Sequence, residues 1–397
     1  MMSVWSSLVG QDAAVAKLSE AAASARAIVA SRGSGRASDE ARSMSHAWLI
    51  TGPPGSGRSV AARAFAAALQ CTGATPGCGQ CPGCRTTMGR TNADVLFAAT
   101  ETSIINVDTA RSLVLQAQSS PSQGLWRVIV VEDADRLGES GANALLKAIE
   151  EPPEHTVWLL CAPSPEDMIA TIRSRCRHLG LRIPTAAAVA DLLVREGVAT
   201  PEVALEAARA AQSHIGLARA LARDPQMRER RRNIITAPAS VRSVGEAVMV
   251  ADRLLETAKA QADAQVADRN AREKADLLRQ LGMEEGESAT KASRAMLRQL
   301  EEDQKRRSKR ALTDAIDRAL IDLLAIYRDV LMVQVGGDDE LINTDLSELV
   351  HQIAHDSMPH QTLARVDHIE TARKRLVANG NPLLVLEDMA ISLRPQA

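Results

Sequence analysis

Aromatic residues are scarce in this sequence, at 2% of 397 residues: four Trp, one Tyr and two Phe. A platform of aromatic side chains that stacks on nucleic-acid bases is therefore not expected. Hydrophobic residues still reach 45%. The core must be built from Ala, Leu, Val and Ile, and this composition favours helices over an all-β fold.

An excess of either charge is also missing, since 47 Lys and Arg face 49 Asp and Glu, for a net charge of -2. No global basic field exists, so any contact with nucleic acid or a membrane must be local. No apolar run approaches the roughly 18 residues of a membrane span. The first residues, MMSVWSSLVGQDAAV, lack a basic segment followed by an apolar one. We expect a cytoplasmic protein.

Strand-like apolar runs alternate with helical segments over the first 180 residues or so. Residues 47–50 predict a strand that leads into a glycine-rich turn and a helix. Residues 128–131 and 157–160 are continuous apolar runs, typical of strands buried on both faces of a parallel sheet. A helix over 141–151 lies between them and ends at two prolines. This order predicts an α/β nucleotide-binding fold with right-handed crossovers.

Strand signals stop at Pro184, and two short Ala-rich helices are expected between residues 185 and 223. Residues 257–310 are charged and poor in large apolar side chains, which predicts a mobile insertion or a solvated helix. Its basic cluster, residues 305–310, favours a solvated tether over an arm that tracks DNA. From residue 311 the apolar spacing is again that of a packed helical domain: Leu312, Ile316, Leu320, Leu323, Leu324, Tyr327 and Leu331.

The glycine-rich turn fits the phosphate-binding frame G-x-x-x-x-G-[KR]-[ST]. Backbone N–H groups around Gly52, Gly55 and Gly57 would face phosphates, and the Ser59 hydroxyl would reach Mg²⁺. The usual lysine is replaced by Arg58, whose planar fork does not substitute for a compact ammonium between phosphates. Weak binding of ATP and Mg²⁺ and a glycine turn without nucleotide both remain open.

An acidic pair, Glu132 and Asp133, follows the second buried strand. A hydrolytic site of this kind needs an Asp for Mg²⁺ followed by a Glu that orients water, and here the order is reversed. Asp133 reaches about one methylene short of the position of such a Glu, and a misplacement near 1 Å can cost on the order of 100-fold in rate. Alternatively, the pair caps or solvates the next helix.

Four of the six cysteines crowd into one short stretch. Cys71, Cys78, Cys81 and Cys84 have the spacing of a tetrahedral zinc site, and nearby glycines supply the bends. Four thiolates would fill every position on Zn²⁺, so the role would be structural. Free thiols in a loop are the alternative. Cys161 and Cys176 are expected to be small core residues.

Several short motifs in order along the chain resemble the clamp-loader branch of the AAA+ proteins. Residues 8–11 (LVGQ) look like its N-terminal GQ box, and the cysteine loop follows the phosphate-loop helix as in bacterial members. Residues 143–153 (NALLKAIEEPP) are similar to its NALLK-x-LEEPP signature, and residues 174–176 match its SRC motif. Residues 379–387 (NGNPLLVLE) are similar to a motif of its collar domain. The match spans most of the chain outside 31–45 and 257–310.

The resemblance implies an AAA+, RecA-like parallel sheet with an embedded zinc module, then a small helical lid and an all-helical collar domain. The expected boundaries are 1–182 with the module at 71–84, 183–238, and 239–397 with the insertion at about 257–310. It also implies a hetero-oligomeric ring with motor subunits and a delta subunit, which acts on the sliding clamp and primed DNA for the DNA-directed polymerase.

Bacterial subunits with both a zinc loop and an SRC motif are of two kinds, an ATP-hydrolysing motor and a subunit with little or no ATPase activity. Arg58, the reversed Glu132-Asp133 pair and the missing sensor-1 Thr in residues 160–164 favour the second kind. The family assigns Arg175 to a neighbour's ATP site as an arginine finger. Arg219 either keeps the sensor-2 contact with nucleotide or is an ordinary solvated residue. The rival hypotheses are the motor itself and a zinc-dependent nucleic-acid-binding module.

Overall fold

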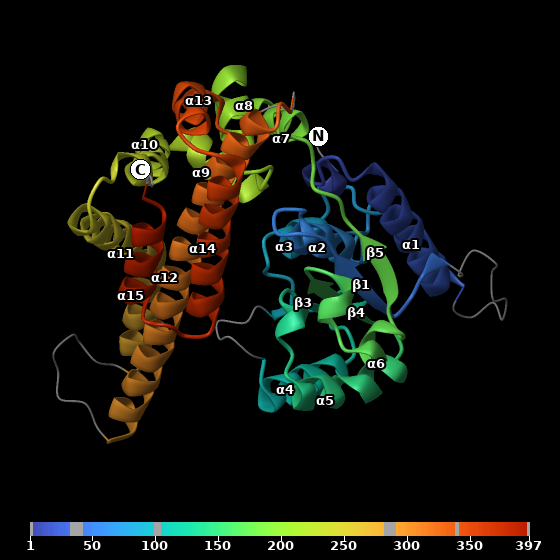
Figure 1. Ribbon diagram of the computed structural model, residues 1–397. Helices are drawn as coiled ribbons and strands as arrows, with labels where there is room; N and C mark the ends of the chain where they lie inside the picture. The colour runs from blue at the N-terminus through green and yellow to red at the C-terminus, as the bar shows by residue number, and fades with distance from the viewer. Residues whose placement is uncertain (1–2, 32–42, 99–104, 282–290, 338–340, 395–397) are drawn as a thin grey trace. The chain divides into compact units, whose positions relative to one another are not determined.

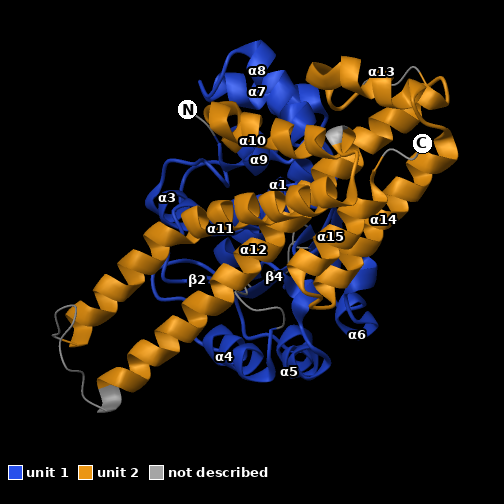
Figure 2. Ribbon diagram, turned by 60° about the vertical axis from the view of Figure 1, so that its left-hand side comes forward, with its two compact units in different colours: residues 1–219 blue, residues 220–397 orange. Residues whose placement is uncertain are grey.

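The computed structural model describes residues 3–31, 43–98, 105–281, 291–337 and 341–394. The chain forms two compact units, residues 1–219 and 220–397 (Figure 2). Most of the polar stretch 31–45 and residues 282–290 of the charged segment lie outside the described residues. Within the described ranges, no helix has both the length and the apolar character that a membrane span requires. The three-domain boundaries stay a prediction.

Unit 1 is built on a five-stranded sheet with the order β2-β3-β4-β1-β5, in which every pair is parallel (Figure 1). The predicted α/β parallel sheet is therefore confirmed. Two strands were not predicted, because β2 is only four residues long and β5 has one buried residue. The strands are β1 (Ala47–Thr51), β2 (Val95–Ala98), β3 (Arg127–Val131), β4 (Thr156–Ala162) and β5 (Arg177–Gly180).

Helices cover both faces of the sheet (Figure 1). Trp48, Ile50 and Phe65 belong to the core under α1 and α2, whereas Leu49, Ile129 and Leu145 belong to the core under α4 and α5. These elements are η1 (Val4–Ser7), α1 (Asp12–Ala30), α2 (Arg58–Leu69), α3 (Pro82–Met88), α4 (Val107–Ala117), η3 (Ala134–Arg136), α5 (Glu139–Glu150), η4 (Pro165–Asp167) and α6 (Ala170–Arg173).

Three short helices follow the sheet, not two: α7 (Ala186–Arg195), α8 (Pro201–Ala210) and α9 (Ile215–Arg223). The prediction of two helices was wrong because the breaks are short. The α7 helix ends at a left-handed Gly197, and Gln212 and Ser213 both have positive φ between α8 and α9. Such residues end a helix locally without the Pro or Gly cluster that sequence reasoning looks for.

Unit 2 is all-helical, and it buries Ile316, Leu320 and Leu323 of the predicted helical repeat. Its core also holds a polar centre: the Asp329 carboxylate accepts hydrogen bonds from the Ile342 and Asn343 backbone N–H groups and from the Asn343 amide. The elements are α10 (Pro225–Thr236), η5 (Ala237–Ser240), α11 (Val244–Leu281), α12 (Lys291–Gln334), η6 (Thr344–Leu346), α13 (Ser347–His355), α14 (Pro359–Val377) and α15 (Pro382–Ser392).

The charged segment forms the distal parts of two long helices, α11 and α12, which lie side by side (Figure 2). Its basic cluster is largely neutralised by carboxylates on the same pair of helices. Arg306 pairs with Glu302 and Asp303, and Arg307 pairs with Glu273. We expected either a mobile insertion or a solvated helix in this segment. Its described residues form solvated helices.

Candidate metal site and nucleotide loop

The four clustered cysteines meet just beyond the C-terminal end of α2. Their Sγ atoms all lie within 4.8 Å of one another, as ligands of one ion would. Cys71 follows α2, Cys81 is the N-cap of α3, and Cys84 lies in its first turn. Left-handed Gly77 and Gly79 make the bends between them, at φ +82° and +76°. The arrangement could hold one metal ion.

Backbone N–H groups in the loop point at sulfur and favour the thiolate form. The Cys81 N–H donates to the Cys78 Sγ, and the Cys84 N–H donates to the Cys81 Sγ, both over 3.4 Å. Burial alone would raise the pKa of Cys81, but hydrogen bonds from the Cys84 and Thr72 backbone lower it to about 6. Burial raises the pKa of Cys84. A thiolate cluster needs an ion to hold its charge together, and zinc fits four closely placed sulfurs.

Contacts from α1 and the N-terminal segment hold this loop, and the sequence pattern did not reveal them. One terminal nitrogen of Arg26 donates to the Gly73 and Ala74 carbonyls and the other to the Cys71 carbonyl, each over 2.8 Å. The Val4 N–H donates to the Gly77 carbonyl over 3.0 Å. An arginine on a helix gives no signal in sequence that it will reach a loop 45 residues further along.

The phosphate-loop residues lie at the carboxyl end of β1, at the start of α2. Gly55 and Gly57 have φ of +89° and +90°, so the loop has left-handed bends that these glycines permit. A Cβ at Gly55 would lie 2.9 Å from the Cα of His214, the residue before α9, whereas nothing lies within 4 Å of a Cβ at Gly57. The loop thus has the left-handed glycine conformations of a phosphate loop. The backbone of His214 packs close to Gly55, whereas no atom packs against Gly57.

Arg58 does not extend away from this loop. Its guanidinium donates to the carbonyl of Gly52 over 2.8 Å, so the side chain folds back on its own loop. The remaining expected residue of the loop, Ser59, lies in the first turn of α2. In this conformation Arg58 donates to a backbone carbonyl of its own loop. A lysine at this position would instead extend its ammonium toward phosphates.

The Gln11 side chain ties the loop to the chain beyond β5. Its amide nitrogen donates to the Ser56 carbonyl over 3.3 Å and to the Arg182 carbonyl over 2.5 Å, and its amide oxygen accepts from the Arg182 N–H. Gln11 is the last residue of the predicted GQ box. Its structural role is therefore to join the loop to the segment that leads into α7.

The acidic pair lies at the same edge of the sheet, after β3. The Glu132 carboxylate accepts from the Arg90 guanidinium over 2.5 Å, and that guanidinium also lies over the Phe97 ring. Burial and the neighbouring Asp133 raise the pKa of Asp135. The first acid of the pair is thus engaged by a basic residue that the sequence did not point to.

The two predicted arginine sites are both in ion pairs within unit 1. Arg175 pairs with Glu150 at the end of α5 and donates to the Thr171 carbonyl over 2.8 Å. Its side chain is 39% exposed. Arg219 makes a two-pronged contact with Glu196, with both nitrogen-to-oxygen distances at 2.9 Å. Cys161 is fully buried in β4 as expected, whereas Cys176 is only half-buried.

A five-stranded parallel sheet with a glycine-rich loop after β1 and acids after β3 is typical of P-loop domains, a class that includes the AAA+ proteins. Residues 36–185 match the family model described as "DNA polymerase III, delta subunit". That part of the chain, less than half of its 397 residues, is therefore similar to subunits of DNA polymerase III.

Known relatives carry two different subunit names. Subunit gamma/tau of Mycobacterium tuberculosis is 36% identical over 162 residues, which are 39% of this chain and 28% of that protein. Subunit delta′ of Pseudomonas aeruginosa is 36% identical over 165 residues, which are 41% of this chain and 50% of that protein. The matched stretch thus spans half or less of the length of these relatives.

A solved DNA polymerase III gamma subunit-related protein of Thermotoga maritima is similar over 88% of this chain and 93% of its own. Its sequence identity is 17% and the TM-score is 0.41.

Proposed function

We propose that this chain is the delta-prime subunit of a DNA polymerase III clamp loader, a stator that takes part in loading the sliding clamp on primed DNA. The observation that carries the proposal is the state of Arg58, whose guanidinium is bonded to the Gly52 carbonyl. A loop that lacks the phosphate lysine and turns its arginine inward supports weak nucleotide binding and little hydrolysis. The role would place the chain in the cytoplasm, beside motor and delta subunits.

In this role, Arg175 acts on the ATP bound by a neighbouring motor subunit. A guanidinium neutralises charge that develops on the transferred phosphoryl group, and such a finger is worth roughly 10³–10⁵ in rate at one site. Arg175 would exchange its present partner, Glu150, for the neighbour's phosphate. Because the side chain is partly exposed, that exchange needs no rearrangement of the core.

The cysteine cluster would hold one Zn²⁺ through Cys71, Cys78, Cys81 and Cys84. The ion would supply no chemistry to ATP turnover, since four sulfurs fill its coordination shell. Its effect would be to fix the loop between α2 and α3.

The second candidate is the ATP-hydrolysing motor subunit, because relatives of both names are equally similar and the glycine loop keeps its bends. A reconstituted clamp loader distinguishes the delta-prime subunit from the motor subunit. A preparation of motor, delta and clamp is assayed for clamp loading and DNA-stimulated ATP turnover with and without this chain. For a stator, loading requires the chain and Ser59→Ala in its own loop leaves turnover by the complex unchanged, whereas for a motor subunit Ser59→Ala lowers that turnover.

The same complex tests Arg175. Replacement by Ala should leave ring assembly intact and lower clamp-stimulated turnover only in part, because one site loses its donor while the others keep theirs. Arg173→Ala is the matched control, an exposed arginine two residues away. Equal turnover for both variants would remove the finger role, and loss of assembly for Arg175→Ala alone would make it an interface residue.

A further inference from the structure

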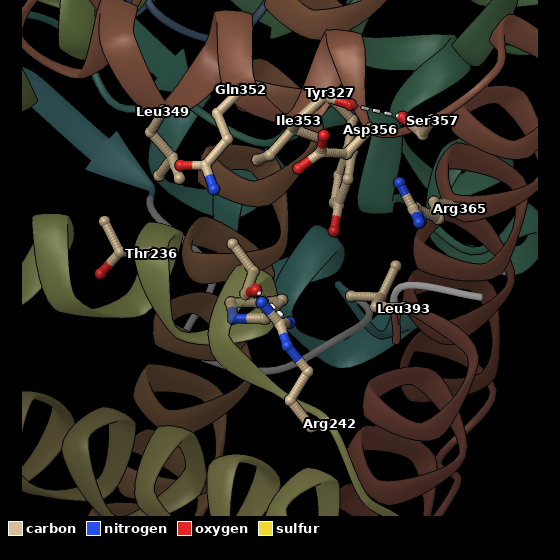
Figure 3. A pocket seen from close by; sticks show the side chains of 12 residues that line it. Thr236, Arg242, Tyr327, Leu349, Gln352, Ile353, Asp356, Ser357, Arg365 and Leu393 are labelled. Carbon is tan, nitrogen blue, oxygen red and sulfur yellow. Dashed lines mark hydrogen bonds between the residues drawn. The ribbon is translucent and has the colours of Figure 1, made fainter. Parts of the chain in front are cut away.

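Unit 2 contains a cavity of about 300 Å³, close to the lower end of the range for small-molecule sites. It lies between the end of α10, η5, the C-terminal part of α12, α13, the first half of α14 and the residue after α15, and Figure 3 shows its side chains. Every lining residue belongs to unit 2. None of them takes part in the cysteine cluster or the nucleotide loop.

One lining residue is a buried cation without an acid partner among the described residues. Arg365 is 7% exposed, and the contact found for its guanidinium is the ring of Tyr327, 5.8 Å from the ring centroid. Burying a guanidinium is costly unless an anion or hydrogen-bond acceptors compensate. Its guanidinium lies at the cavity wall beside Tyr327 in Figure 3. A ligand that carries negative charge would supply the missing partner.

The Tyr327 hydroxyl adds a neutral donor to the same wall. It makes no hydrogen bond within the described part of the chain, and the side chain is 3% exposed. Burial raises the pKa of this phenol to about 12, so it keeps its proton at neutral pH. A phenol O–H and a guanidinium together match the acceptor oxygens of a carboxylate.

The other charges of the lining limit how negative the ligand can be. Arg242 is a second guanidinium, and it donates to the Ala239 carbonyl over 2.8 Å. Asp356 places one carboxylate on the lining, beside His355. Two cations and one anion leave an excess of one positive charge, which complements a monoanion better than a dianion.

The rest of the lining is apolar and would cover an uncharged ligand body. Leu349 and Ile353 come from α13, Pro238 and Ala239 from η5, and Leu393 follows α15. Apolar walls with a few convergent polar groups are typical of sites for small organic ligands. We propose that this cavity binds a small monocarboxylic acid with an aromatic or branched apolar group, its carboxylate on Arg365 and Tyr327.

The single tyrosine of the chain makes the test specific, because Tyr327 is the only one in the sequence. The full chain is labelled with 3-fluorotyrosine, and its one ¹⁹F resonance is followed during titration with phenylacetate. We expect a saturable shift below about 10 mM. Phenylacetamide, which lacks the charge, and phenyl phosphate, which carries more charge, should each bind at least about tenfold more weakly.

Arg365→Gln removes the cation and should weaken phenylacetate binding about tenfold or more. Arg253→Gln, on α11 and outside the cavity, is the matched control and should bind as the parent chain does. Where Arg365→Gln fails to fold, Arg242→Gln on the exposed rim replaces it, with a smaller loss expected. The inference is overturned by a resonance that phenylacetate does not move, by equal binding of the amide, or by tighter binding of the phosphate.

Discussion

The two ends of helix α2 carry two candidate sites, and only one of them has the side chains that its chemistry requires. At the N-terminal end, the glycine loop keeps its left-handed bends, but Arg58 is folded onto the Gly52 carbonyl. At the C-terminal end, four sulfurs lie within 4.8 Å of one another, and two of them accept backbone N–H groups. Backbone geometry is intact at both ends. Metal binding has all the side chains that it requires at the C-terminal end, whereas ATP hydrolysis lacks its lysine at the N-terminal end.

The difference shows that loop shape and site chemistry are separable. Left-handed glycines in the phosphate loop position α2 against the sheet. They keep that role even though Arg58 replaces the lysine of the phosphate-binding frame. The cysteine cluster differs, because four thiolates placed this closely would repel one another without an ion. We therefore expect substitutions of the clustered cysteines to damage structure, and substitutions of the Arg58 and Ser59 side chains to change nucleotide affinity alone.

Cys81→Ser should have the largest effect, because it removes one of four ligands and the acceptor of the Cys84 N–H. We expect the parent chain to hold one zinc per molecule and the variant to lose it, with loss of order in residues 71–84. Elemental analysis and limited proteolysis measure the two effects. Cys176→Ser, outside the cluster, should keep its zinc, and a parent chain without zinc would contradict the assignment.

Asp94 gives a reference for stability outside the cysteine cluster and the glycine loop. Its buried carboxylate accepts from the N–H groups of Ser122, Gln123 and Gly124 and from the Ser122 hydroxyl. Asp94→Ala should cost about 3 kcal/mol in the free energy of unfolding by urea, since several hydrogen bonds to a charge are lost together. Asp108→Ala, at a largely exposed carboxylate in the first turn of α4, should cost well under about 1 kcal/mol, and equal costs would contradict this reading.

The pH dependence at Asp94 has a defined sign. Burial would raise the pKa of this carboxyl, but the backbone hydrogen bonds from Ser122, Gly124 and Gln123 outweigh it and hold the pKa below its usual value. The stabilisation is complete above the unfolded pKa, about 3.9, and is lost as pH falls through the folded value. Urea unfolding between pH 7 and pH 3 should show a smaller loss for Asp94→Ala than for the parent chain.

Arg26→Met tests whether the cysteine loop depends on support from α1. The substitution removes three hydrogen bonds to carbonyls of the loop, at Cys71, Gly73 and Ala74, and leaves all four ligands in place. Losing such outer support typically costs 10- to 100-fold in metal affinity, and we expect a loss of about tenfold. Competition with a zinc chelator measures it. Arg85→Met, exposed on α3, is the control and should bind as the parent does.

The sequence was sufficient for features that depend on residue type and short spacing. Continuous apolar runs identified β1, β3 and β4, and the cysteine spacing identified a cluster that the fold brings together. Contacts between distant segments were not accessible. Arg26 reaches a loop 45 residues away, and Arg90 reaches Glu132 from 42 residues away. The local sequence around Arg26 or Arg90 does not reveal these partners, because the two segments come together only when the helices pack.

Arg58→Lys should have the smallest effect, confined to the loop end of α2. A lysine lacks the fork that bonds the Gly52 carbonyl and would extend a compact ammonium toward phosphates. We expect ATP affinity to rise about three- to tenfold, the size of one modest charge contact, with unchanged zinc content. Titration with a fluorescent ATP analogue measures this. Arg111→Lys on α4 is the control, and equal affinity for both would contradict the inward arginine as the cause.

The account depends most directly on whether the chain turns over ATP with its own loop. The purified chain is incubated with ATP and Mg²⁺ without any partner, and phosphate release is compared with that of Ser59→Ala. We predict that release does not exceed background and that the two proteins do not differ, since Arg58 is bonded to Gly52 and Glu132 to Arg90. Steady turnover that Ser59→Ala abolishes would contradict the account and identify the chain as a motor.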